Sequence, residues 1–120
     1  MNPLLLSTGI IGFMAVALGA FGAHGLEDRL TSAAKGWWAT ATLYALVHAA
    51  AALALAVRPE PSPTLSWAGA AFLLGVLIFS GSLYAMALGA PRWFGMITPI
   101  GGLSFLTGWG LIILYGIKSA

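Results

Sequence analysis

The residue with the clearest chemical potential is His48, which lies near the middle of the apolar stretch 37–57. That stretch carries no formal charge and is long enough to cross a bilayer, so His48 is an ionisable group deep in lipid. An ionisable residue inside a membrane span is a functional-site hypothesis by default. The imidazole can be a structural hydrogen-bonding group, can bind a ligand or handle a proton, or can ligate a haem or metal.

Hydroxyl side chains fall at helical spacing around this histidine. Tyr44 lies four residues before His48, and Ser80 and Tyr84 share a helix face in the same way. Counted along antiparallel spans at about 1.5 Å per residue, these side chains and Thr98 crowd into one half of the membrane. We therefore expect a polar half-membrane pocket. Its predicted ligand-binding residues are His48, Tyr44, Ser80, Tyr84, Thr98 and, at the membrane rim, His24.

The residue types in the chain limit which catalytic mechanisms are available to it. The chain has no cysteine, which excludes disulfides, thiolate metal sites and a thiol nucleophile. Its three acids, Glu27, Asp28 and Glu60, all fall between apolar stretches, so no carboxylate pair and no acid to orient the imidazole is expected within the membrane. His24 at the rim and His48 at mid-depth poorly match the opposed geometry of a bis-histidine haem. We predict no enzyme, no catalytic residue, no metal site and no cofactor.

The amino-acid composition indicates that these polar side chains belong to a membrane protein. The 120 residues are 60% hydrophobic and 7% charged, whereas a soluble domain has roughly 25% charged residues. Four apolar stretches, at about 4–23, 37–57, 65–88 and 94–117, predict an all-α antiparallel four-helix transmembrane bundle that forms a single domain over residues 1–120. The net charge of +2 rests on eight side chains, so we expect membrane lipids and no nucleic acid as partners.

Small residues recur on these stretches at steps of three and four. In lipid, close backbone approach over small residues is what holds helices together. The predicted helix-packing residues are Gly12, Gly19, Gly81, Gly101 and Gly108. The segment TPIGG near the start of the fourth stretch contains a proline, so Thr98 either caps a helix that begins at Pro99 or marks a break in the helix.

The loops carry the charges. After the first stretch, Leu26, Leu30, Ala33 and Trp37 fall on one helical face, which predicts a short helix in the headgroup plane; a folded-back loop is the alternative. The segment RPEPSPTLS predicts an extended turn.

The basic residues also predict the orientation. Arg29, Lys35 and Arg92 belong to one side of the membrane, and Arg58 and Lys118 to the other. The positive-inside rule then places the first set in the cytoplasm and both termini outside.

Four motifs in order, GAFGAHGL, WxTATxYxxxHA, FSGSLYxxAL and TPIGGxxFxxGW, resemble the YgdD-like family of small inner-membrane proteins, which has eukaryotic relatives. The resemblance runs from about Gly19 to Trp109. It implies four spans and a location in the cell (inner) membrane, and it implies no defined reaction. The residues that carry it are His24, Tyr44, His48, Ser80, Gly81, Ser82, Tyr84, Thr98, Pro99, Gly101, Gly102 and Trp109.

Two functions follow as hypotheses. The first is a non-enzymatic helical bundle that packs with itself, as a homo-oligomer, or within a larger membrane complex. The alternative is binding or transport of a small molecule or lipid, including proton-linked transport, through the polar pocket around His48.

Overall fold

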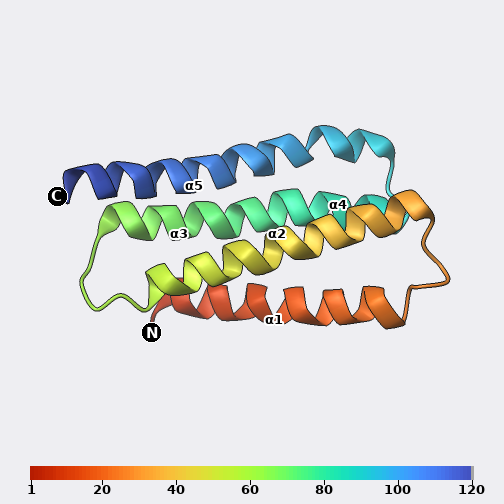
Figure 1. Cartoon of the computed structure of the whole chain (residues 1–120), viewed down its shortest axis with the longest axis horizontal. Helices are drawn as coiled ribbons and strands as arrows, with labels where there is room; N and C mark the ends of the chain where they lie inside the picture. The colour runs from red at the N-terminus through yellow and green to blue at the C-terminus, as the bar shows by residue number, and fades with distance from the viewer. Residues whose placement is uncertain (120) are drawn as a thin grey trace.

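Figure 1 shows the computed structural model of the chain, which describes residues 1–119, as four long antiparallel rods. Their elements are α1 (Pro3–His24), α2 (Ser32–Ala56), a third rod made of α3 (Pro63–Gly75), the π-helical segment η1 (Val76–Ser80) and α4 (Gly81–Ala87), and a fourth rod made of the 3₁₀ helix η2 (Arg92–Met96) and α5 (Thr98–Lys118). All four rods are long and apolar enough to cross a membrane. The all-α, four-span prediction is therefore confirmed.

Local capping chemistry sets where three of the rods begin. The side chains of Asn2, Thr31 and Ser62 each accept a hydrogen bond from the backbone N–H three residues later, at 3.1, 3.1 and 3.2 Å. Proline follows two of these caps directly, as Pro3 and Pro63. Proline is favoured at the first helical position because its missing N–H would have no partner there.

The interfacial helix predicted after the first span does not form. Residues 25–31 make turns instead, and α2 already begins at Ser32 rather than near residue 37. The reason is packing: Leu26 is buried against Ala34, Trp38 and Ala87, so the apolar face meets protein rather than the headgroup plane. The folded-back loop is the arrangement observed.

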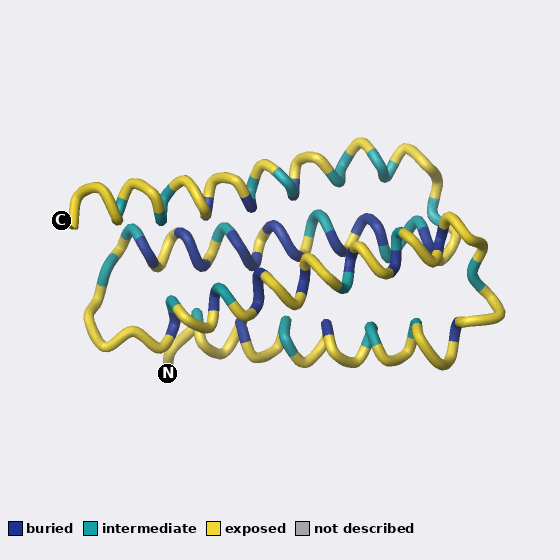
Figure 2. The backbone as a smooth tube through the Cα atoms, viewed as in Figure 1, coloured by how far each residue is buried: buried dark blue, intermediate teal, exposed yellow. Residues whose placement is uncertain are grey.

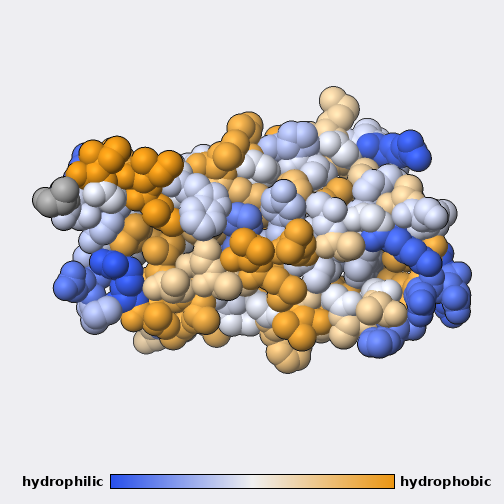
Figure 3. Space-filling model, in the orientation of Figure 1, coloured by the Kyte–Doolittle hydropathy of each residue, from blue (hydrophilic) through white to orange (hydrophobic). Residues whose placement is uncertain are grey.

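The rods are arranged around α2 and the α3–α4 rod. Helix α1 packs against α2, and α5 packs against α3, so α1 and α5 lie on opposite sides of the central pair (Figure 1). Buried positions concentrate on this central pair, while the outer sides of α1 and α5 are exposed (Figure 2). Hydrophilic residues gather at the two ends of the molecule, with mainly apolar surface between them (Figure 3). This is the surface expected of a protein that spans a bilayer.

Small side chains allow the central helices to approach closely. Helix α2 buries a run of alanines at helical spacing: Ala41, Ala45, Ala49, Ala52 and Ala56. Larger buried side chains lie among them, including the aromatic rings of Phe72 of α3, Trp38 of α2 and Phe105 of α5. Backbone proximity over alanine and glycine, rather than large interlocking side chains, is the usual basis of helix association in lipid.

In the fourth rod, the break anticipated at TPIGG lies just before Thr98, where the 3₁₀ helix η2 gives way to α5, and the alternative of a Thr98 cap is not observed. Helix α5 begins at Thr98 itself, with Pro99 in its first turn, and no side chain caps it. The Thr98 hydroxyl is directed instead to Ser82 Oγ, at 2.6 Å. Proline is tolerated here because the N–H groups of a first turn have no intrahelical partner.

Candidate functional site

His48 lies at the centre of the bundle with 5% of its surface exposed. Both ring nitrogens have partners within the chain. Nδ1 lies 2.9 Å from the carbonyl oxygen of Tyr44, and Nε2 lies 3.1 Å from the indole Nε1 of Trp109. The histidine therefore joins α2 to α5 through a side-chain hydrogen bond.

These two bonds determine the tautomer of the ring. The indole N–H can only donate, so His48 Nε2 must accept. The Tyr44 carbonyl can only accept, so Nδ1 must carry the proton and donate it. The arrangement thus holds a neutral imidazole whose hydrogen-bonding capacity is fully used.

Aromatic rings enclose the imidazole. The ring of Phe105 stacks on it with centroids 3.8 Å apart, and Phe72 meets it edge-on at 5.2 Å. Tyr44 and Phe79 extend this layer, with Tyr44 packed against Phe79 at 4.6 Å. A ligand that reached His48 would have to displace both a hydrogen bond and a stacked ring.

Two further hydroxyls tie α2 to the third rod. Ser80, 1% exposed, donates to the carbonyl oxygen of Ala41 at 2.7 Å. The Tyr84 hydroxyl lies 2.7 Å from Thr42 Oγ1, and the Tyr84 ring packs edge-on against Trp38 at 4.6 Å.

Another pair of contacts ties the third rod to the fourth. Thr98 bonds to Ser82, whose hydroxyl donates to the Phe79 carbonyl at 2.9 Å. Ser104 Oγ donates to the Ala71 carbonyl at 2.7 Å. In the membrane interior an unsatisfied polar group costs several kcal/mol, so these pairings allow the hydroxyls to be buried.

The residues of the predicted polar pocket therefore form separate hydrogen-bonded contacts between helices. His48, Ser80, Tyr84 and Thr98 each bond to a different partner, and no hydrogen bond among the described residues joins any two of these four. Tyr44 stacks parallel to His48, with centroids 6.0 Å apart, and remains 39% exposed.

His24 lies apart from the other predicted residues. It is the exposed last residue of α1 and takes no part in the buried layer. The sequence thus located residues that are central to packing, but the structure does not gather them around one cavity.

The predicted packing glycines fall into two groups. An added Cβ at Gly19 would lie 2.9 Å from Thr42 Cγ2, at Gly101 2.7 Å from Phe79 Cα, and at Gly108 2.6 Å from Phe72 Cδ1. These three lie at tight helix contacts. At Gly12 and Gly81 an added Cβ would meet nothing within 4 Å, so neither glycine packs against another helix of this chain. Helical periodicity cannot distinguish an inward from an outward glycine.

Three hydrogen-bond partners were missed as site residues: Trp109, Thr42 and Ser82. Each is a polar side chain in an apolar span, which was the available signal. Tyr44 and His48 share one face of α2, whereas Thr42, which contacts the Tyr84 hydroxyl, lies on the neighbouring face. Among residues 1–119, no group of three His, Asp or Glu side chains is placed to hold a metal ion.

Comparison with known proteins agrees with the family resemblance. Residues 18–102 match the family model described as "Protein of unknown function (DUF423)". The chain is 40% identical over 117 residues to the inner membrane protein YgdD of Escherichia coli K12, covering 96% of this chain and 89% of the relative. It is 39% identical over 121 residues to a UPF0382 membrane protein of Staphylococcus epidermidis, covering 100% and 99%. No solved structure matches the chain.

These matches confirm the resemblance and the predicted location. With four helices able to span a bilayer and a relative named as an inner membrane protein, the chain is a multi-pass protein of the cell membrane.

Proposed function

Since this chain belongs to the DUF423 family of membrane proteins, we propose that it is a non-enzymatic helical bundle that acts by packing α1 against α1 of a second copy. The supporting observation is a notch on the outer face of α1. An added Cβ at Gly9 would meet nothing within 4 Å. Phe13, one turn later, projects from the same face and is 75% exposed.

The notch is a shallow hollow of about 500 Å³ around Gly9, lined by Leu5, Leu6, Gly9, Ile10, Phe13 and Met14. Glycine in a helix is about 1 kcal/mol less favourable than alanine, and within this chain Gly9 gains no close contact in return. Close approach of a second helix would supply one. A protruding ring beside a hollow is self-complementary, as an interface between two identical copies requires.

The polar groups support a role without catalysis. His48, Ser80, Tyr84 and Thr98 are each engaged in an internal bond. General acid–base chemistry needs a group that is free to exchange a proton with a substrate. The same bonds weigh against the alternative function, binding or transport at His48, because both of its ring nitrogens are already used.

Disulfide crosslinking in native membranes tests the pairing, since the chain has no cysteine of its own. Gly9→Cys should give a linked dimer on oxidation, because a disulfide needs Cα atoms within about 7 Å. Gly102→Cys on α5 is the matched control, since Gly102 is also a glycine with no atom within 4 Å of an added Cβ. Adding Phe13→Ala to Gly9→Cys should reduce the linked fraction. Equal crosslinking at both glycines, or none at Gly9, would overturn the proposal.

A further inference from the structure

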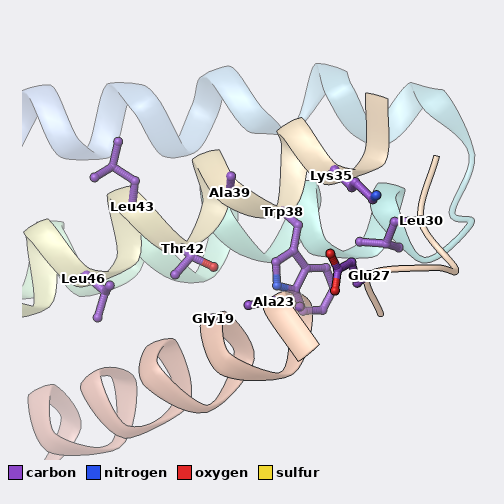
Figure 4. A pocket seen from close by; sticks show the side chains of 11 residues that line it. Gly19, Ala23, Glu27, Leu30, Lys35, Trp38, Ala39, Thr42, Leu43 and Leu46 are labelled. Carbon is purple, nitrogen blue, oxygen red and sulfur yellow. The ribbon is translucent and has the colours of Figure 1, made fainter. Parts of the chain in front are cut away.

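A groove runs between α1 and α2 on the lipid-facing side of the molecule (Figure 4). It has a volume of about 550 Å³. Its floor on α1 is made of the small residues Gly19, Gly22 and Ala23, and its outer wall on α2 includes Leu43 and Leu46. These two leucines are 59% and 41% exposed, so the groove opens sideways to the bilayer.

Most of the groove is formed by the packed helices α1 and α2. Trp38 closes its inner side, is 5% exposed and donates from Nε1 to the Leu18 carbonyl at 2.8 Å. That bond holds the two helices at a set spacing beside Gly22. Thr42, farther along the wall, is held by the Tyr84 hydroxyl at 2.7 Å.

The two charged residues of the groove both belong to its loop end. Glu27, in the loop after α1, and Lys35, in the first turns of α2, lie beside Leu30 and Trp38 (Figure 4). Both side chains are exposed. Among the described residues, no carboxylate lies within the 4.0 Å ion-pair distance of the Lys35 ammonium. One anionic and one cationic group are therefore available at the same mouth.

The length of the groove matches one membrane leaflet. Leu46 lies eleven positions after Lys35 on α2, which corresponds to roughly 16 Å along the helix. The hydrocarbon core of a bilayer is about 30 Å thick, so an apolar chain lying in the groove would end near the midplane. The groove thus has a charged end at headgroup depth and an apolar length suited to one acyl chain.

We propose that this groove binds a zwitterionic phospholipid with a primary ammonium headgroup, of the phosphatidylethanolamine type. Lys35 pairs with the phosphate and Glu27 with the ammonium, while one acyl chain lies over Gly19 along Leu43 and Leu46. A phospholipid without the ammonium would pair its phosphate with Lys35 but would leave the Glu27 carboxylate without a cationic partner. The site is separate from the outer face of α1, so it does not depend on self-association.

The test is native mass spectrometry of the full chain in detergent with an equimolar mixture of phosphatidylethanolamine and phosphatidylglycerol. Exposed charge pairs contribute up to about 1 kcal/mol, so the wild type should retain phosphatidylethanolamine about two- to fivefold more than phosphatidylglycerol. Glu27→Gln should bring that ratio toward one. Lys35→Gln should lower retention of both lipids.

The apolar length of the groove has its own variant pair. Ala39→Phe fills the groove from an exposed position of α2 and should reduce retention of both lipids. Ala50→Phe, also exposed on α2 but outside the groove, should not. Equal retention of the two lipids by the wild type, or an unchanged ratio in Glu27→Gln, would overturn the proposal. Glu27 is an exposed loop residue, so Glu27→Gln should fold. It therefore tests the proposal even if Ala39→Phe does not fold.

Discussion

At the scale of single residues, the one histidine within a membrane span has a hydrogen-bond partner for each ring nitrogen. His48 donates from Nδ1 to the Tyr44 carbonyl and accepts at Nε2 from Trp109. Stacking on Phe105 covers one face of the ring. An uncharged imidazole with both nitrogens paired avoids most of the penalty of burying a polar group in a span.

The bond between His48 and Trp109 should be measurable as a coupling energy. Trp109→Phe removes the indole donor and leaves Nε2 without a partner, so it should lower the free energy of unfolding. His48→Phe should do the same from the other side. Because the double variant removes both partners, its loss should be smaller than the sum of the single losses by about 0.6–1.7 kcal/mol. The measurement is unfolding in mixed detergent micelles followed by circular dichroism.

The control for this cycle is the second histidine. His24→Ala, at the exposed end of α1, should leave stability unchanged, whereas His48→Ala should lower it clearly. Strict additivity of the two phenylalanine variants would contradict a direct His48–Trp109 interaction.

At the scale of elements, glycines with similar sequence surroundings have different roles. The π-helical segment Val76–Ser80 interrupts the third rod, and Gly101 of α5 packs directly against the backbone of Phe79 there. The ring of Phe105 packs against Gly75, just before the segment, in the space that a side chain would occupy. A π-helical turn widens the helix locally, and α5 follows that surface closely because glycines stand at the contacts.

Neighbouring glycines of α5 make this contact testable. Gly101→Ala would place a methyl group 2.7 Å from Phe79 Cα, so it should lower the free energy of unfolding by about 1–3 kcal/mol. Gly102→Ala meets no atom within 4 Å and should be neutral or stabilising by up to about 1 kcal/mol. Thermal unfolding in detergent compares the two. Equal effects would mean that α5 does not approach the third rod through Gly101.

At the scale of the whole molecule, the four antiparallel rods bring both termini to one end (Figure 1). The opposite end carries Arg29, Lys35 and Arg92, and the Arg92 guanidinium lies over the Trp37 ring at 5.8 Å. At the terminal end, Arg58 donates to the Tyr115 hydroxyl at 3.1 Å. The basic residues are therefore divided three to two between the ends.

This charge distribution predicts the orientation in the membrane. The end with three basic residues should face the cytoplasm, which places both termini outside. A C-terminal alkaline phosphatase fusion should therefore be active, and a C-terminal green fluorescent protein fusion should be dark. The reverse result would place both termini in the cytoplasm. Fusions at the N-terminus should agree with those at the C-terminus, because an even number of spans separates the two ends.

The sequence by itself determined the class of fold, the four membrane spans and the family. Long uncharged apolar runs have one stable solution in a bilayer, a helix whose backbone bonds are all internal. It also identified the polar residues that matter to packing, such as His48 and Ser80, because polar groups are rare in such runs.

The tertiary structure decided what those residues do, because partners depend on the rotation and spacing of helices that are far apart in the chain. It paired His48 with Trp109, 61 positions away, and turned Gly101 inward while leaving Gly12 and Gly81 facing outward. It also buried Leu26 in a folded-back loop and opened the groove between α1 and α2. Helical periodicity shows which residues share a face, whereas only the packed bundle shows what that face meets.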